Sequence, residues 1–478
     1  MQINSTDYIF IAAILLLLLI TLVVRGVYNN LIKKSKNESI NDTQQKLLNM
    51  VIDEVSDTKN ILFYTTCGVA LLYVAWRYSS AKGLESHVHE WLNLVVRWAH
   101  VLFGIAWIGA SFYFIFLENS LNRKDGLRDD IAGNLWAIHG GGFYYVEKYK
   151  LAPAELPSKL HWFKYEAYFT WLTGFLLLII VYYTNAKSYL IDETVMKLSV
   201  AQAASIGIGT LVGGWILYDV LCKSPLRHNK MLFAIVGFAM VTGISYFLTH
   251  VFNSRAAFMH VGAMLGTIMV GNVFFVIIPS QKALVRAAIE GKPLNEQLGK
   301  NAGLRSLHNN YITLPVIFVM ISNHFPSTVS SAWNWAILIG ISLAGAGARH
   351  YINMHEKGRN LNWLIPTVGV ALISLMIITA PQKRKTGKDA PPVAFSQVQP
   401  IFQTRCVPCH SSHPTDDTQT TAPNGVMYDT PAQIQKMADK ILVRAVQTKT
   451  MPQGNKTNIT EEERELIGNW IEQGAKIE

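Results

Sequence analysis

Cys406 and Cys409 are separated by two residues, and His410 follows the second cysteine directly. Two thiols at this spacing with an adjoining histidine form the attachment signature of a c-type haem, in which the histidine becomes the proximal iron ligand. Met451 precedes a proline about forty residues further on and is the candidate second axial ligand. The motif therefore predicts one covalent haem c, bonded to Cys406 and Cys409, with His410 and Met451 on the iron.

Two other interpretations of this motif are half of a zinc site and a redox-active Cys-x-x-Cys pair. Zinc would need a second pair of ligands, but the remaining cysteines, Cys67 and Cys222, lie far away in apolar segments. Haem c is attached outside the cytoplasmic membrane. The haem interpretation therefore places residues from about 390 onward in an extracytoplasmic (periplasmic) compartment, and the upstream chain must deliver them there.

The composition is that of a membrane protein. Half of the 478 residues are hydrophobic and only 15% are charged, and apolar runs long enough to cross a bilayer recur along the chain. The net charge of +10 does not indicate nucleic-acid binding, because the excess of Lys and Arg lies in the membrane part, where it reports loop topology. We expect the lipid bilayer as a partner and no nucleic acid.

Apolar stretches predict ten transmembrane spans. They cover approximately residues 8–26, 60–78, 91–118, 165–185, 198–221, 231–250, 256–280, 311–325, 332–349 and 361–380. The first has the length of a signal peptide, but Asp7 precedes its apolar core, Arg25 follows it, and it has no small-x-small cleavage site. We interpret it as an anchor whose N-terminus lies outside.

The loop charges test this topology independently. The loops assigned to the cytoplasmic side hold 23 Lys and Arg, against 5 in the outer loops, so the positive-inside rule agrees with haem attachment. The predicted fold class is all-α: a polytopic transmembrane helical bundle of about ten spans with both termini outside, followed by a small α-helical cytochrome c domain. The expected location is the bacterial cytoplasmic (inner) membrane.

Four segments follow from this topology. They are an N-terminal anchor span with a polar cytoplasmic loop (1–60), a transmembrane domain (61–380), a basic linker that contains proline (381–392) and the cytochrome c domain (393–478). Within the last segment we expect an opening helix around Val398–Cys406 and a closing helix around Thr460–Gly474, which starts on a threonine cap. These two helices should pair around the haem.

Histidines at membrane depth are costly and usually functional. His100 in the third span lies above a glycine on one helical face, and His260 in the seventh span repeats this arrangement. Such histidines commonly hold haem b, so His100 and His260 are the candidate axial pair, with His250 and His324 as alternates. Arg97, on the face of His100, is the candidate partner of a haem propionate. The alternative is that each histidine is hydrogen-bonded to a neighbouring helix.

The cytoplasmic side carries a different combination. His139 precedes Gly140, Gly141 and Gly142, whose backbone N–H groups can approach an anionic ligand closely. Histidine, amide, lysine and aromatic side chains at the mouths of the fourth and eighth spans would suit a planar, polar anion; they are His161, Trp162, Lys164, Glu166, His308, Asn309, Asn310 and Tyr311. Alternatively, these aromatics and lysines are interfacial anchors, or the inner histidines hold a second haem b.

Five segments in this order, ahead of a cytochrome c, resemble the membrane-bound bacterial urate oxidases (urate hydroxylases). That family joins a urate-oxidase membrane domain to a C-terminal cytochrome c domain, and the resemblance covers about residues 85–478. The segments are HEWLNLVVRWAHVLFGIAWIGASFYF (89–114), LWAIHGGGFYYVEKY (135–149), LHWFKYEAYFTW (160–171), RAAFMHVGAMLGTIMVGNVFFVIIPSQ (255–281) and HNNYITLPVIFVMISNHFP (308–326). The resemblance implies oxidation of urate to 5-hydroxyisourate, with electrons passed to the respiratory chain and not directly to oxygen.

Roles for the inner residues follow from this resemblance. Urate would stack near Trp162 or Tyr311, and the amides of 140–142 with Lys164 would hold its anionic oxygens. His139 or His161 would remove the ring proton as two electrons leave. The remaining residues, Glu166, His308, Asn309 and Asn310, complete the candidate site. Electrons would pass through one or two haems b and the haem c to a soluble cytochrome c or a terminal oxidase.

Two other classes of function fit the same motifs. The chain could be a quinol-to-cytochrome electron-transfer module, in which the glycine loop holds a quinone head group or simply packs. It could instead be a purine carrier or sensor with a tethered cytochrome. Haem reduction by quinol but not by urate would favour the first, and urate uptake without haem reduction would favour the second.

Overall fold

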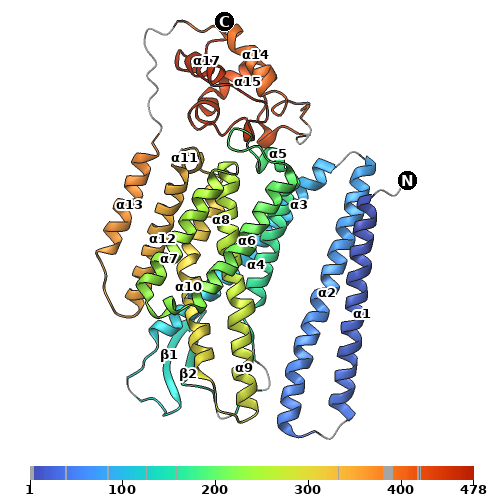
Figure 1. The fold of residues 1–478 in the computed structure, drawn as a ribbon, viewed down its shortest axis with the longest axis vertical. Helices are drawn as coiled ribbons and strands as arrows, with labels where there is room; N and C mark the ends of the chain where they lie inside the picture. Colours follow the sequence, from blue (N-terminus) through green and yellow to red (C-terminus); the bar gives the residue numbers. More distant parts are fainter. Residues whose placement is uncertain are drawn as a thin grey trace. The chain divides into compact units, whose positions relative to one another are not determined.

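The computed structural model describes residues 5–37, 40–82, 85–124, 126–153, 155–157, 160–331, 333–380, 391–416, 419 and 421–477 (Figure 1). Most of the described chain is α-helical, as the sequence predicts. The predicted linker lies mainly outside the described residues. The chain divides into two compact units: unit 1 comprises Met1–Leu92, Asn122–Trp162 and Ile277–Gly303, and unit 2 comprises Asn93–Leu121, Phe163–Val276 and Leu304–Glu478.

Unit 1 contains a long helical hairpin. Helices α1 (Ser5–Asn37) and α2 (Asp42–Lys82) pack against each other along their length, and they contain the first two predicted spans. Helix α9 (Ile278–Ile289) packs against α2, where Lys282 pairs with Glu54. A surface ion pair of this kind contributes little to stability, so it adds little to the packing of α9 against α2.

A β-hairpin in unit 1 departs from the predicted all-α class. Strands β1 (Ile131–His139) and β2 (Gly142–Tyr149) are antiparallel, and His139 pairs with Gly142. Gly140 and Gly141 form the two-residue turn with φ of +58° and +79°, which L side chains rarely adopt. Aromatic and β-branched residues on both sides of a Gly-Gly pair are a hairpin signal, but the prediction treated this segment as a loop.

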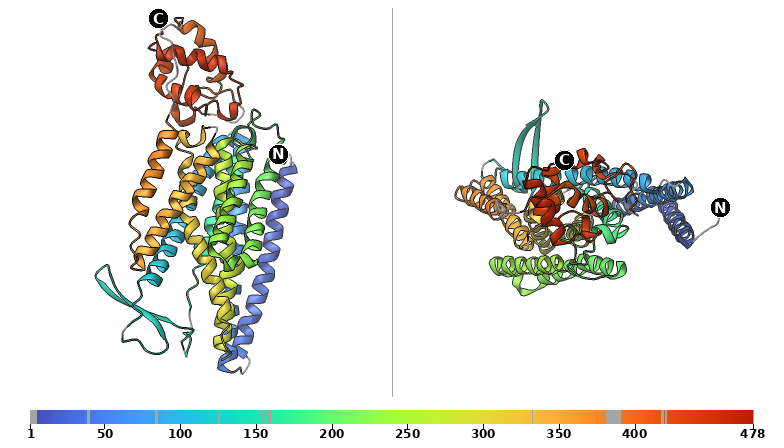
Figure 2. Two further views of the ribbon diagram at one scale, coloured as in Figure 1. Left: turned by 60° about the vertical axis from the view of Figure 1, so that its left-hand side comes forward. Right: turned by 90° about the horizontal axis from the view of Figure 1, so that it is seen from above.

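Unit 2 is built around helix α8 (Ser254–Gly271), whose side chains are mostly buried. It packs against α4, α6 and α7, and Figures 1 and 2 show the long helices of this unit running alongside one another. Small residues permit the close approach, since a Cβ at Gly271 would lie 2.6 Å from the Trp215 ring and one at Gly262 would lie 2.5 Å from Val319.

The remaining elements of this bundle alternate long helices with short turns. They are α3 (Glu85–Ser120), whose first residues belong to unit 1, α4 (Tyr165–Leu177), the π-helical η1 (Leu178–Tyr183), α5 (Ala186–Tyr189), α6 (Val200–Lys223), the 3-10 turn η2 (Pro225–His228), α7 (Lys230–Thr249), the π-helical η3 (Asn272–Ile277), α10 (Glu296–Ser322), which also begins in unit 1, α11 (Pro326–Val329), α12 (Asn334–Glu356) and α13 (Leu364–Ile378).

Six stretches within the described helices are long and apolar enough to cross a membrane, which is consistent with a membrane protein. They are Ile14–Lys36, His87–Ser120, Tyr165–Tyr183, Val200–Lys223, Lys230–Thr249 and Ser254–Ile289. These correspond to the first and the third to seventh predicted spans. The other four predicted spans are helical, in α2, α10, α12 and α13, but do not meet the same criteria of length and apolarity. The total of ten spans therefore stays a prediction.

The C-terminal domain, defined here as residues 391–477, consists of short helices around its own apolar core. Its helices are α14 (Phe395–Arg405), the 3-10 turn η4 (Pro423–Gly425), α15 (Pro431–Lys436), α16 (Ala438–Ile441), the π-helical η5 (Leu442–Gln447), the 3-10 turn η6 (Gln453–Asn455) and α17 (Glu461–Glu472). Trp470 of α17 is 1% exposed, and its ring lies 5.6 Å from Phe395 and 5.9 Å from Phe402 of α14. The expected pairing of the first and last helices is confirmed.

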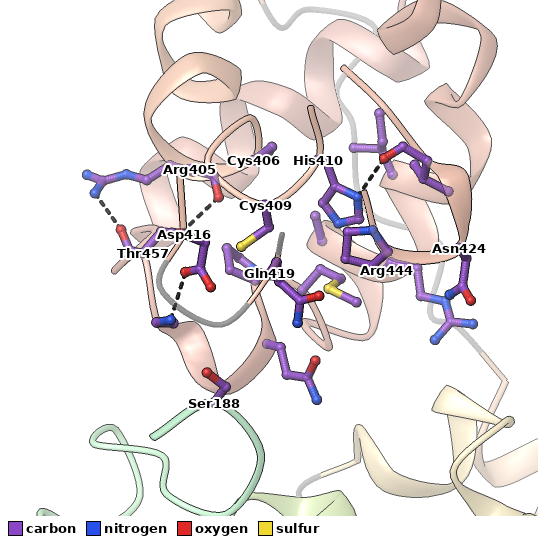
Figure 3. Close-up of a pocket in the computed structure, with 18 of the residues that line it drawn as sticks. Ser188, Arg405, Cys406, Cys409, His410, Asp416, Gln419, Asn424, Arg444 and Thr457 are labelled. Carbon is purple, nitrogen blue, oxygen red and sulfur yellow. Dashed lines mark hydrogen bonds and ion pairs between the residues drawn. The ribbon is translucent and has the colours of Figure 1, made fainter. Parts of the chain in front are cut away.

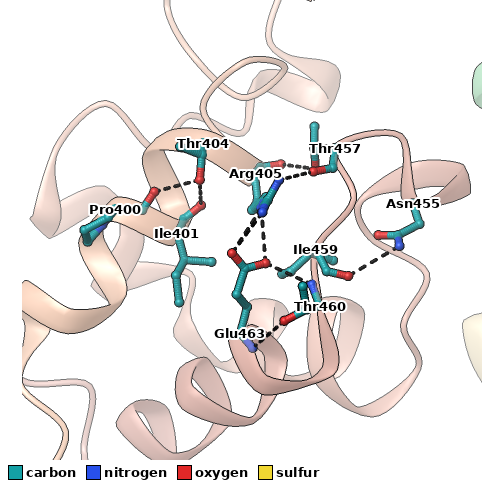
Figure 4. Close-up of polar contacts among 9 residues, drawn as sticks. All are labelled: Pro400, Ile401, Thr404, Arg405, Asn455, Thr457, Ile459, Thr460 and Glu463. Carbon is teal, nitrogen blue, oxygen red and sulfur yellow. Dashed lines mark hydrogen bonds and ion pairs between the residues drawn. The ribbon is translucent and has the colours of Figure 1, made fainter.

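The start of α17 is tied to the end of α14 (Figure 4). Thr460 caps α17 as predicted, because its Oγ1 accepts from the Glu463 N–H at 3.2 Å, while the Glu463 carboxylate accepts from the Thr460 N–H at 2.9 Å. The same carboxylate accepts from Arg405 Nε at 3.1 Å. One glutamate thus serves both the helix cap and the contact between the two helices.

We predict that Trp470→Ala destabilises the C-terminal domain by about 3–5 kcal/mol, because it leaves a large cavity between Phe395 and Phe402. The measurement is urea-dependent proteolysis of the intact, detergent-solubilised chain, followed with an antibody to the C-terminus. Glu465→Ala, an exposed position on the same helix, is the control and should change the urea midpoint little. Equal midpoints for the two variants would contradict this account of the core.

Candidate functional site

Cys406, Cys409, His410 and Met451 line one cavity of about 580 Å³ (Figure 3). Helix α14 ends at Arg405, and the chain then makes a tight turn in which the His410 N–H donates to the Cys406 carbonyl at 2.9 Å. This turn lets both sulfurs and the imidazole reach the same space. The four residues that the sequence pattern selected are therefore together, although Met451 comes from a separate loop.

His410 is oriented by a backbone hydrogen bond. Its Nδ1 lies 3.0 Å from the Val426 carbonyl, and its ring lies 5.1 Å from the Tyr428 ring. Burial lowers the pKa of His410, so the imidazole is neutral near pH 7. A neutral imidazole that donates from Nδ1 has its lone pair on Nε2, which is the atom a metal ligand of this type uses.

The thiol of Cys406 is not set up as a reactive thiolate. Burial, with a further contribution from the nearby Cys409, raises the pKa of Cys406 to about 12. A redox-active Cys-x-x-Cys pair or a thiolate zinc site needs the opposite shift. Within the ranges that the structure describes, three or more His, Cys, Asp or Glu side chains nowhere gather at a possible metal site, so the side chains here do not favour zinc.

The opposite wall of the cavity comes from residues at helix ends of the bundle. Ser188 lies in α5, Arg255 lies at the start of α8, and Asn323 follows α10; all three line the cavity (Figure 3 labels Ser188). The Ser188 Oγ, the Arg255 Nε and Nη2, and the Asn323 Oδ1 are buried and have no hydrogen-bond partner in the described chain. His324, an alternate in the haem b prediction, lines the same cavity.

The histidines proposed for haem b are hydrogen-bonded within the bundle. His260 is fully buried, with Nδ1 at 2.8 Å from the Ala256 carbonyl and Nε2 at 3.1 Å from the Tyr183 hydroxyl. His100 Nδ1 lies 3.0 Å from the Thr170 carbonyl of α4. These contacts match the alternative of a histidine bonded to a neighbouring helix, and the haem b ligands stay a prediction.

Two other residues of that prediction lie in more exposed positions. His250 is exposed and its Nδ1 lies 2.7 Å from the Tyr246 carbonyl. Arg97 is exposed and donates to Asn93 Oδ1 at 2.9 Å. Among the four candidate histidines, the structure therefore buries only His260 completely.

The predicted urate-binding residues fall into separate groups. His139, Gly140 and Gly141 are exposed at the tip of the β-hairpin, with Gly142 beginning β2, and His161 and Trp162 also belong to unit 1. Lys164 and Glu166 lie at the start of α4 in unit 2 and are buried and half-buried. His308, Asn309, Asn310 and Tyr311 share one turn of α10 in unit 2.

A buried polar network surrounds the first two of these α10 residues. Arg305 is 5% exposed and donates from Nη2 to Asp219 at 2.6 Å and from Nη1 to Asn272 at 3.1 Å. Asn272 in turn donates to Asn309 Oδ1 at 2.8 Å, and His308 Nδ1 lies 2.8 Å from the Tyr218 hydroxyl. Sequence reasoning missed Tyr218, Asp219 and Asn272, although polar residues in apolar segments were the available signal. It counted Arg305 only as a charge of the predicted loop 281–310.

A second polar group surrounds the other two α10 residues. Asn353 donates to Asn310 Oδ1 at 2.7 Å, and the Tyr311 hydroxyl lies 2.7 Å from His350 Nδ1, with the two rings stacked. Arg349, one turn before Asn353 on α12, is 2% exposed. Arg349 was counted only as a loop charge and Asn353 was not considered, because the linear sequence does not show which residues α12 presents to α10.

The comparisons with known proteins agree with the membrane part of the resemblance. The family model described as urate oxidase N-terminal matches residues 86–380, which include both polar groups. The chain therefore belongs to the urate oxidase N-terminal family, which indicates a function related to urate. No curated protein and no solved structure matches the chain. The C-terminal domain lies beyond the matched residues.

We predict that Asp219→Ala destabilises the bundle by about 3–5 kcal/mol, because it leaves the buried Arg305 guanidinium without its carboxylate. The measurement is the midpoint of heat-induced aggregation in detergent, monitored by size-exclusion chromatography. Lys223→Ala is the control, since Lys223 pairs with the same carboxylate but its side chain is 71% exposed. The account is contradicted if both substitutions lower the midpoint equally.

Proposed function

We propose that this protein is a membrane-bound enzyme that oxidises urate to 5-hydroxyisourate and passes the electrons to a haem c in its C-terminal domain. The observation that carries the proposal is the presence, in one chain, of a urate oxidase N-terminal segment and a cavity lined by Cys406, Cys409, His410 and Met451. The first supplies the substrate class. The second supplies an attachment site for an electron carrier.

The residues around the cavity fit haem c. Two cysteine sulfurs, one imidazole and one thioether are the usual donor set for this group, and the cavity lies within the range of about 300–1,000 Å³ that is usual for small-molecule sites. The unpartnered Arg255 Nε and Nη2 match the geometry of a propionate carboxylate. When bound, haem c supplies one-electron transfer.

The chemistry assigned to the bundle is a two-electron oxidation with addition of water. The urate monoanion and one water molecule yield 5-hydroxyisourate, one proton and two electrons; the oxygen at C5 comes from water, and both electrons leave for the acceptor. The chain's own part is to bind a flat anion, to accept a ring proton and to exclude bulk water. The candidate residues at the start of α4 and on α10 are both in unit 2, which keeps them available for one site.

The proposed setting is the bacterial cytoplasmic membrane, with urate bound from the cytoplasmic side and the C-terminal domain in the periplasm. Haem b, held by His100 and His260 or by the alternates His250 and His324, belongs to the proposal as an intermediate carrier. The final acceptor is a soluble cytochrome c or a terminal oxidase. The observations that support this setting are the long apolar helices and the distribution of Lys and Arg among the loops.

The test is anaerobic addition of urate to the purified, oxidised, detergent-solubilised protein, with the visible spectrum as readout. We predict that c-type and b-type α-bands both rise, and that a Cys406→Ser/Cys409→Ser variant loses covalent haem staining and the c-type band. A rise of the c-type band alone would contradict the histidine assignment. If neither band moves while dithionite reduces a c-type haem, urate oxidation is contradicted, and quinol reduction and urate uptake test the two alternative functions.

We also predict that Met451→His lowers the midpoint potential of the haem c, since a methionine ligand raises this potential relative to histidine. Met437 lines the same cavity, so Met437→Leu is the matched control and should leave the potential nearly unchanged. Potentiometric titration of both variants is the measurement. If Met437→Leu shifts the potential while Met451→His does not, the axial ligand is Met437.

A further inference from the structure

Arg349 is a buried cation that forms no salt bridge in the described part of the chain, although the charge of Glu356, two turns further along α12, acts on it. It lies on α12 with 2% of its surface exposed, and none of the carboxylates in the described ranges forms an ion pair with it. Arg305 in the same unit is buried to a similar extent but has Asp219 and Asn272 as partners. Because a buried unpaired charge is strongly unfavourable, the contrast points to an anion that is not part of the chain.

The unpartnered atoms of this region form a consistent pattern. Arg349 Nε and Nη2 are buried without hydrogen-bond partners in the described part of the chain, and these two atoms form the edge of a guanidinium that binds planar anions in a bidentate way. The Asn310 Nδ2 and the Asn353 Oδ1 are likewise buried and unpartnered. The group therefore offers several donors and one acceptor.

Contacts between α10, α12 and α3 place these side chains close together. Asn353 donates to Asn310 at 2.7 Å, and Arg349 and Asn353 are one helical turn apart on α12. The guanidinium lies 4.1 Å from the centre of the Phe112 ring of α3. On α10, Tyr311 follows Asn310 and its hydroxyl lies 2.7 Å from His350 Nδ1. One aromatic ring, that of Phe112, thus adjoins the guanidinium, and the Tyr311–His350 pair occupies the next positions along α10 and α12.

We propose that Arg349, Asn310 and Asn353 form the binding site for the urate monoanion, with Arg349 holding its anionic edge through Nε and Nη2. This inference rests on the proposed function and names the substrate contacts. The acceptor Asn353 Oδ1 calls for a ligand N–H next to the anionic edge, which a purine anion has and a chloride lacks. Phe112 and Tyr311 offer flat apolar surface suited to a planar ring.

The proposal changes the predicted site in one respect. Asn310 and Tyr311 stay in it, while Arg349 and Asn353 from α12 take the role that sequence reasoning gave to Lys164 and the amides of residues 140–142. His350, paired with Tyr311, is the nearest titratable ring in this group and becomes the candidate acceptor for the urate proton.

The test is the equilibrium binding of [14C]urate to the full-length protein in detergent, after reduction with dithionite so that urate cannot be oxidised. Arg349→Gln should bind urate about 100-fold more weakly than the wild type, and Arg349→Lys, which retains the charge without the bidentate edge, should be intermediate. Arg359→Gln, an exposed arginine just beyond the end of α12, is the matched control and should bind as the wild type does.

A second variant separates binding from folding. Asn353→Asp places a carboxylate one turn from Arg349, where it can occupy the guanidinium and repel an anion. We predict that this variant is at least as heat-stable as the wild type and yet binds urate at least 100-fold more weakly. A purely structural role for Arg349 predicts the same gain in stability with urate affinity unchanged.

The outcomes distinguish this inference from the proposed function. If wild-type protein binds urate and is reduced by it, and Arg349→Gln and Asn353→Asp bind urate normally, the site assignment is wrong and the function stands. If the wild type neither binds urate nor is reduced by it, the proposed function itself fails. Loss of binding in both variants, with Arg359→Gln unaffected, supports the site.

Discussion

The structure depends on one constraint: a polar group buried in an apolar bundle must find its partner inside the bundle. Arg305 satisfies it through Asp219 and Asn272, and this network holds α6, η3 and α10 together. His260 satisfies it through Ala256 and Tyr183. In contrast, the Nε and Nη2 atoms of Arg349 and of Arg255 are buried and have no hydrogen-bond partner among the described residues. These two arginines are informative, because at each of them we propose a ligand that carries negative charge.

These two exceptions correspond to the two halves of the proposed reaction. Arg349 lies among the α10 and α12 residues assigned to urate, whereas Arg255 lines the cavity that holds Cys406 and His410. Arg255 is the second residue of α8, which leads to Asn272 of the Arg305 network, and its 18 residues span about 27 Å. The proposal includes haem b, held by histidines of the bundle, as an intermediate carrier of electrons to the C-terminal domain.

The sequence predicted the features that are local. The Cys-x-x-Cys-His motif, the long apolar helices and the capped closing helix depend on residues close together in the chain. The structure contains both helical features and gathers the motif with Met451. The β-hairpin was missed because a Gly-Gly turn was interpreted as a loop. Asp219, Asn272, Arg349 and Asn353 were missed because their meaning depends on which helix faces which, and periodicity within one helix does not contain that information.

The central claim is that electrons from urate leave through the C-terminal domain and not directly to oxygen. The most direct measurement is oxygen uptake and urate consumption by the Cys406→Ser/Cys409→Ser variant beside the wild type, with an external cytochrome c as acceptor for both. The account predicts that the variant consumes neither urate nor oxygen, while the wild type oxidises urate and reduces the acceptor without oxygen. Oxidation of urate by the variant at the wild-type rate, with hydrogen peroxide formed, would contradict it.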